Sequence, residues 1–178
     1  MTLLALVLLA VVLVAIAVWA SWTAGRLDRL HHLVETAEAS LDAQLVRRSA
    51  VALEVASSGL LDPAASVLLA EAAHEARAAT DVDRGPAESA LSVALRAVLG
   101  QPGLREQVAR AGDAALALLD ELVASAQRAA FARTFHNDAV AAAVRIRHKR
   151  PVRWLRLAGT AREPRIFEFD DQPPATAA

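Results

Sequence analysis

The chain contains no cysteine among its 178 residues, and it has a single lysine, Lys149. Without cysteine there is no disulfide bond, no thiolate nucleophile, and no anchoring through a lipidated or palmitoylated side chain. The sequence also lacks the nucleotide-binding patterns G-x-x-x-x-G-K-[ST] and G-x-G-x-x-G and the hydrolase pattern G-x-S-x-G. We therefore expect no enzyme, no catalytic residue and no cofactor.

Charged side chains are absent from the first 22 residues, and Leu3–Ala20 is an unbroken apolar run. At about 1.5 Å per helical residue, this run spans roughly 27 Å, close to the ~30 Å hydrocarbon core of a bilayer. Its Leu, Val and Ile side chains favour membrane insertion by about 4 to 7 kcal/mol. Trp19 and Trp22 lie at the end of the run, where indole rings prefer the membrane interface. The run predicts a transmembrane helix.

A cleaved signal peptide is the alternative interpretation of this run. It would need a basic segment before a shorter apolar core, whereas nothing basic precedes Leu3. The nearest cationic side chains, Arg26 and Arg29, follow the run. By the positive-inside rule they place the rest of the chain in the cytoplasm, so we expect a single-pass membrane protein with a cytoplasmic C-terminal domain.

Helical periodicity continues beyond the apolar run. Leu, Val and Ala recur at every third or fourth position from Leu27 to Leu45, which predicts a helix over 26–56 with a heptad-like seam. This helix can be continuous with the transmembrane helix, with an interruption at most near Gly25. The charged side chains of the helix, including those of Arg47 and Arg48, are expected on its other faces.

Three further helices are predicted from their boundary signals. The first of them starts at Asp62-Pro63, a pair typical of a helix N-terminus, and the next lies between Pro86 and Gly100. The last helix begins near Leu104 and has no convincing stop before Pro151, so it should cover about 44 residues, or roughly 65 Å. Four helices with short connections predict an all-α fold, with an antiparallel, coiled-coil-like four-helix bundle after the transmembrane helix.

Three regions follow from this pattern. Residues 1–25 form the transmembrane anchor and residues 26–150 form the helical bundle. Residues 151–178 are a basic, extended segment in which "RIFEF" docks by its aromatic side chains and "DDQPPATAA" is a disordered tail. Many seam positions are alanine, which buries little area per residue, so the bundle should be modestly stable and a homo-oligomer is plausible.

Two stretches, residues 41–48 and 132–140, resemble motifs of the LemA family. These are bacterial proteins with an N-terminal membrane span followed by a bundle of long helices. The family form D-x-Q-L-x-R-R is similar to "LDAQLVRR", and "ARTFHNDAV" has the alanine-arginine pair, aromatic, asparagine and acidic-Ala-Val triplet of the second motif. The matching residues are Asp42, Gln44, Leu45, Arg47 and Arg48, then Ala132, Arg133, Phe135, Asn137, Asp138, Ala139 and Val140, with Pro151 and Phe167-Glu168 after them.

The chain also departs from this pattern. His136 stands where a tyrosine is usual, Arg150 replaces an aromatic residue before Pro151, and a Leu-Ile-Pro-Asn stretch is missing after the double arginine. The resemblance implies a divergent, arginine- and alanine-rich family member in a bacterial cell membrane. It implies no biochemical activity, because none is settled for the family.

A carboxylate in a tight seam of alanine and leucine needs a cationic partner, because an unpaired buried charge is costly. Asp42 lies 16 residues beyond Arg26, or about 24 Å along the helix. The returning fourth helix reaches the same height near residue 131, so Arg128 and Arg133 are its expected partners. We interpret Asp42 as a residue that sets the register of the bundle, in preference to a ligand site.

Two polar residues late on the fourth helix allow two interpretations. Asn137 and His136 can fix the helix register, as a single asparagine does in coiled coils. They can also form a partner-binding patch near the membrane. We favour the first interpretation.

The segment "RIRHKRPVRWLR" gathers cationic side chains around one tryptophan. A nucleic-acid site would use them on phosphates, but no recognition fold accompanies the segment. A solvated helix end, where cations are favourable, is a second alternative. We favour contact with anionic lipid headgroups, since each basic residue near such a surface is worth roughly 1 kcal/mol. The membrane-surface residues are Arg145, Arg147, Lys149, Arg150, Arg153, Trp154 and Arg156.

Glu71 and His74 have the Glu-x-x-His spacing of di-iron bundles, but such sites need two of these pairs and two further glutamates. We expect a solvated helix face there and no metal. The sequence as a whole predicts a non-catalytic, membrane-anchored scaffold or protein-interaction module. Its process and protein partners are not indicated, and nucleic acid is not expected among the partners. A metal-binding or enzymatic bundle and a nucleic-acid-binding membrane protein are the alternatives.

Overall fold

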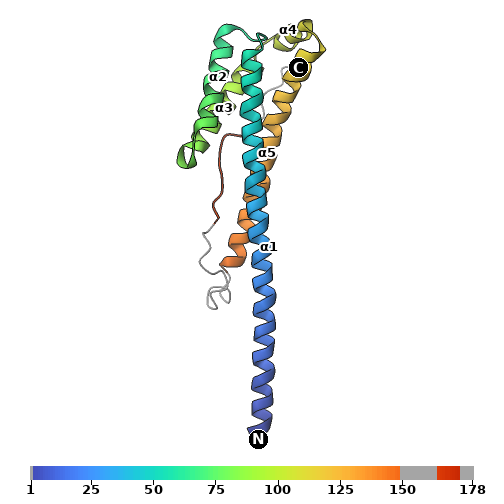
Figure 1. Cartoon of the computed structure of the whole chain (residues 1–178), viewed down its shortest axis with the longest axis vertical. Coiled ribbons are helices and arrows are strands. Elements are labelled where there is room, and N and C mark those ends of the chain that lie inside the picture. Colours follow the sequence, from blue (N-terminus) through green and yellow to red (C-terminus); the bar gives the residue numbers. More distant parts are fainter. Residues whose placement is uncertain (1, 149–163, 173–178) are drawn as a thin grey trace. The chain divides into compact units, whose positions relative to one another are not determined.

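The structure is a computed structural model that describes residues 2–148 and 164–172. Over these residues the chain forms α-helices joined by short connections and one 3-10 turn, with no strand, so the predicted all-α helical bundle is confirmed (Figure 1). The helices are α1 (Thr2–Ser57), α2 (Pro63–Ala78), α3 (Arg84–Leu99), α4 (Leu104–Ala111) and α5 (Asp113–Arg147), with the 3-10 turn η1 at Asp81–Asp83.

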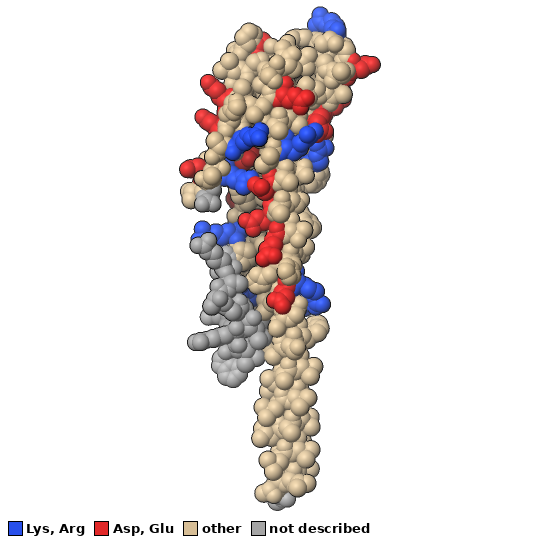
Figure 2. All heavy atoms as spheres, in the orientation of Figure 1, with Lys and Arg blue, Asp and Glu red and all other residues tan. Residues whose placement is uncertain are grey.

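Helix α1 runs without interruption over 56 residues and continues through Gly25. The large apolar side chains between Leu3 and Val18 are all exposed, whereas later turns of the same helix carry buried side chains. Figure 2 shows the N-terminal part of α1 free of charged side chains, which gather on the rest of the visible face. By length and composition, α1 is apolar enough to cross a membrane.

The described residues divide into two compact units, each built on part of α1 and part of α5. The first lies within residues 1–37 and 137–166. In it, Val34 and Ala37 of α1 pack with Val140 of α5, and Leu27 packs with Ile146. Residue numbers rise along α1 as they fall along α5, so the two helices are antiparallel there.

The second unit lies within residues 38–136 and 167–178, and it contains the largest hydrophobic core. This core joins the last turns of α1 to α2, α3 and the facing turns of α4 and α5, with Leu69, Leu91, Leu95 and Leu122 among its fully buried side chains. Alanines fill many of the remaining core positions. They let the helices approach closely while burying little apolar area each.

The helix boundaries agree in part with the sequence signals. The Asp62 side chain caps α2 by accepting hydrogen bonds from the N–H groups of Ala64 and Ala65, both at 3.0 Å, and Pro63 is the first helical residue. The prediction of a single helix from Leu104 to Pro151 is wrong, because the helix is interrupted at Gly112, between α4 and α5. Gly112 has φ +114°, a conformation that essentially only glycine adopts, and the 3.5-residue periodicity concealed this break.

Candidate functional site

The second unit contains a cluster of charged and aromatic side chains that join α1, α3, α5 and the residues Phe167–Gln172. We call Phe167–Gln172 the C-terminal segment; it is drawn in dark red in Figure 1 and has no regular secondary structure. Arg48, Arg96 and Arg133 contact it from three different helices, and we call them the arginine cluster.

Arg48 and Glu88 form an ion pair at the base of this cluster, with both side chains 2% exposed. The Arg48 guanidinium also donates to the Ser92 hydroxyl and to the Glu88 carbonyl oxygen, each at 2.9 Å. Ser92 in turn donates to the same carbonyl at 3.1 Å. The buried charges of α1 and α3 therefore have several partners, as such charges require.

Burial dominates the electrostatics of this pair. It raises the pKa of Glu88 above its ordinary value of 4.5, against the opposing attraction of Arg48. It also lowers the pKa of Arg48, against the opposing attraction of Glu88. Glu88 therefore depends on Arg48 to stay ionised in a site that disfavours charge.

The Phe169 ring packs over the Arg48 guanidinium. Its ring centroid lies 4.8 Å from Cζ of Arg48 and 5.8 Å from Cζ of Arg133, within the range of cation–π attraction. Phe169 is 7% exposed and packs with Leu41 and Leu45 of α1. Nε of Arg48 is buried without a hydrogen-bond partner in the described structure, so the aromatic face is an important contact of this guanidinium.

Polar contacts hold the residues after Phe169. The N–H of Asp170 donates to the Ser89 hydroxyl at 3.0 Å, and the Asp170 carboxylate pairs with Arg96. Arg133 donates to the Asp171 carboxylate at 2.5 Å. The Arg96 partner lowers the pKa of Asp170 below its ordinary value of 3.8. The prediction of a disordered tail is therefore wrong for Asp170 to Gln172, while residues 173–178 lie outside the described residues.

The backbone of the segment also lies very close to α3. A Cβ atom added at Gly85 would lie 2.7 Å from the carbonyl oxygen of Glu168, closer than van der Waals contact allows. Glycine at this position lets the segment reach α3. The expectation that "RIFEF" is extended and docks by its aromatic side chains is confirmed, since Phe167 and Phe169 both pack into the same cluster with ring centroids 5.9 Å apart.

The predicted partners of Asp42 are wrong. Asp42 forms an ion pair with Arg84 at the start of α3, while Arg133 pairs with Asp171 and Arg128 with Glu121. The helical rise along the first and last helices does not account for α3, which places the Arg84 guanidinium beside Asp42.

Arg47 and Arg48 have different environments. Arg47 is exposed and donates to Glu121 of α5 at 3.1 Å, where Arg128 donates to the same carboxylate oxygen at 2.6 Å. The expectation that Arg48 lies on an outer face is wrong. Its position continues the buried seam, three residues after Leu45 and four before Ala52, and the partners on α3 allow a charge to occupy it.

The remaining predicted residues lie near the middle and end of α5. His136 is buried and Asn137 is half-buried, and the choice between a register role and a partner-binding role stays a prediction. Arg145 and Arg147 occupy the last turn of α5. The other predicted membrane-surface residues, Lys149, Arg150, Arg153, Trp154 and Arg156, lie outside the described residues.

Several residues of the cluster were missed by the sequence reasoning, among them Glu88, Arg96 and Phe169. A signal existed for Glu88, because Leu91 and Leu95 follow it by three and seven residues and share its buried face. No comparable pattern marks Arg96 or the acidic pair after Phe169. Their roles depend on segments far apart in the sequence.

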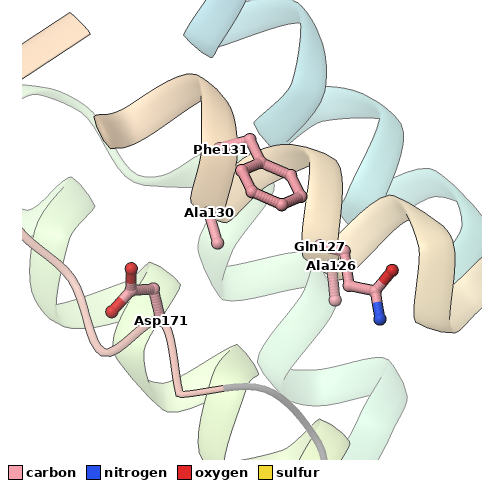
Figure 3. Close-up of a pocket in the computed structure, with 5 residues that line it drawn as sticks. All are labelled: Ala126, Gln127, Ala130, Phe131 and Asp171. Carbon is pink, nitrogen blue, oxygen red and sulfur yellow. The ribbon is translucent and has the colours of Figure 1, made fainter. Parts of the chain in front are cut away.

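A pocket of about 380 Å³ lies between α5 and the C-terminal segment (Figure 3). It is lined by Ala126, Gln127, Ala130, Phe131 and Asp171. The lining carries no nucleophile beside a base. Within residues 2–148 and 164–172, no group of three or more His, Asp or Glu side chains is placed to hold a metal ion.

The comparisons with known proteins add no relative. No family model matches the chain, and no match was found among curated proteins or solved structures. The resemblance to the LemA family stays a prediction. The arrangement itself suits one task, which is to hold an extended aromatic and acidic peptide segment against three helices.

Proposed function

We propose that this protein is a single-pass membrane protein whose helical bundle is a non-catalytic scaffold or interaction module. The observation that carries the proposal is the contrast along α1. Its apolar side chains are exposed near the N-terminus, whereas buried seam residues occur from Leu27 onward. A continuous apolar surface of this length is unfavourable in water and matches the thickness of a bilayer.

The basic residues at the end of α5 support a membrane-surface contact as part of this function. Ile146, between Arg145 and Arg147, packs with Leu27, which lies about 10 Å along α1 from Ala20 at the end of the apolar run. Under the proposed anchoring, both arginines are close to the headgroup region. Anionic headgroups attract cations there, and the helix C-terminus favours them as well.

We place the protein in a bacterial cell membrane with its bundle in the cytoplasm, as a divergent relative of the LemA family. The contacts of the motif residues support a structural role for them. Asp42 and Arg48 pair with α3, and Arg133 holds the C-terminal segment. These residues secure the bundle, which is consistent with a module that binds partners rather than transforms a substrate.

Cysteine mapping tests the anchor, because the natural chain has no cysteine. Single variants Thr2→Cys and Ser57→Cys are expressed in bacteria and treated with a membrane-impermeant maleimide before and after permeabilisation. We expect Ser57→Cys to react only after permeabilisation, and the protein to stay in the membrane fraction at alkaline pH. Release into the soluble fraction would disprove the anchor. Labelling of Ser57→Cys in intact cells would show that the bundle lies on the outer side of the membrane, opposite to the proposed topology.

The membrane-surface contact has a separate test. Native mass spectrometry of the full chain in detergent with phosphatidylglycerol should show fewer retained lipids for the double variant Arg145→Gln, Arg147→Gln than for the wild type. Arg77→Gln, at an exposed arginine of α2, is the control and should retain the wild-type number. Equal retention by all three proteins would contradict the lipid contact, and steeply salt-dependent binding of DNA or RNA would favour a nucleic-acid function instead.

A further inference from the structure

The C-terminal segment binds the bundle as a peptide ligand binds a receptor. It has no helical or strand hydrogen bonding, and side-chain contacts with three helices hold it in place. Residues 148–166 separate it from the end of α5. A chain of this length can span up to roughly 60 Å when extended, so covalent connection leaves the segment considerable reach.

The contacts select a specific chemistry. The arginine cluster receives one aromatic ring between Arg48 and Arg133, then one carboxylate on Arg96 and another on Arg133. Gly85 and Ser89 accommodate the backbone of the segment. The surface therefore recognises an extended segment of the form F-x-F-D-D, with charges opposite to its own.

Unfilled apolar surface borders the docked segment. Phe131 and Phe135 of α5 are 74% and 55% exposed, and their spacing of four residues places them on one helix face. Phe131 also lines the pocket beside Asp171. The contact surface of the segment thus continues into an apolar patch that a monomer leaves exposed to water.

We propose that the arginine cluster is an interaction surface for the C-terminal segment of a second copy of this chain, so that neighbouring copies exchange their segments. Every copy carries both the surface and its ligand, and an exchange retains every contact seen within one chain. This partner rests on the proposed function, because anchoring in one membrane raises the effective concentration of copies.

Cross-linking of the full chain in lipid vesicles tests the exchange. Ala130→Cys on the pocket wall and Gln172→Cys in the segment are introduced into separate chains, which are mixed and treated with a short bismaleimide. Exchange predicts a cross-linked dimer between the two variants. Adding Phe169→Ala to the Gln172→Cys chain should reduce the dimer by at least about ten-fold, as loss of a buried aromatic anchor does. Glu168→Ala, at an exposed side chain, is the matched control and should leave the yield unchanged.

A chain carrying both cysteines distinguishes exchange from docking within one chain. Dilution with cysteine-free wild-type chain at constant total protein should lower the dimer yield if segments exchange. A product linked only within one chain, with a yield unaffected by dilution, would overturn the proposal. Asp171→Asn, a milder change than Phe169→Ala, should also lower the dimer yield, and circular dichroism checks that each variant stays helical.

Alkaline extraction of the same vesicles separates this proposal from the membrane anchor. A dimer formed by chains that alkali releases would count against the anchor alone. Exclusive cross-linking within chains that resist extraction would count against the exchange alone.

Discussion

Replacement of Arg48 by methionine is the sharpest perturbation of the bundle. The apolar stem of the side chain is largely retained, but Glu88 loses its only ion-pair partner among the described residues in a site that is 2% exposed. Removing one member of a buried pair destabilises a protein by about 3–5 kcal/mol, because the other charge is left uncompensated. Phe169 also loses the guanidinium below its ring. We therefore expect a loss of about 3–5 kcal/mol at neutral pH.

The loss should depend on pH in a defined direction. Burial already raises the pKa of Glu88 above 4.5, and without Arg48 only the weaker attraction of Arg84 opposes that rise. The folded state of the variant then binds a proton more tightly than the unfolded state does. Its stability is lost as the pH rises through the raised pKa of Glu88, and it recovers as the pH falls towards the ordinary value.

Urea unfolding in detergent, followed by circular dichroism at several pH values, measures both effects. Arg47→Met is the matched control, since Arg47 is the neighbouring residue and its side chain is 57% exposed in its pair with Glu121. Its effect should be small and nearly independent of pH. The double variant Arg48→Met, Glu88→Leu should recover much of the lost stability. A cost below about 1 kcal/mol, or a cost that does not shrink in acid, would refute the buried-pair reasoning.

Three further predictions concern the C-terminal segment and the break in the last helix. Because Arg96 lowers the pKa of Asp170, docking is stable above pH 3.8 and is lost as the pH falls through the lowered value; hydrogen exchange of the segment should accelerate there. Gly85→Ala places a Cβ against the carbonyl of Glu168, so the same amides should exchange faster at neutral pH while the helices keep their protection. Gly112→Ala should destabilise the bundle by about 1–3 kcal/mol in thermal unfolding, because alanine disfavours φ +114°; an unchanged midpoint would contradict the need for glycine.

Local sequence patterns predict much of the fold. The predicted seam positions of α1 are buried, with Leu30 partly so, and the Asp62 cap is where the sequence placed it. Both depend on residues within a few positions of each other, which a single sequence displays directly. The break at Gly112 was missed because its apolar spacing remains compatible with a continuous helix. The interruption depends only on the backbone conformation of Gly112, which the spacing of apolar residues does not reveal.

The candidate site was less accessible to sequence reasoning. The spacing of Arg48 matches the buried seam, but its charge favours an outer face of the helix. Only the ion pair with Glu88 explains why the side chain is buried. The acidic residues after Phe169 had the composition of a disordered tail, and only their cationic partners on α3 and α5 give them an ordered place. Sequence periodicity shows which residues of one helix share a face. It does not show which residues of distant segments become neighbours in the folded chain.

The unbroken course of α1 imposes a rotational phase on the protein. Each residue turns an α-helix by about 100° and advances it by about 1.5 Å. One residue inserted between Trp22 and Leu27 would swing the apolar run by that angle relative to the buried seam, whereas seven residues would return it to within about 20°. Under the proposed anchoring, the face that the N-terminal run offers to neighbouring lipids or helices is thus tied to the direction in which the buried side chains of Leu27 and Val34 point.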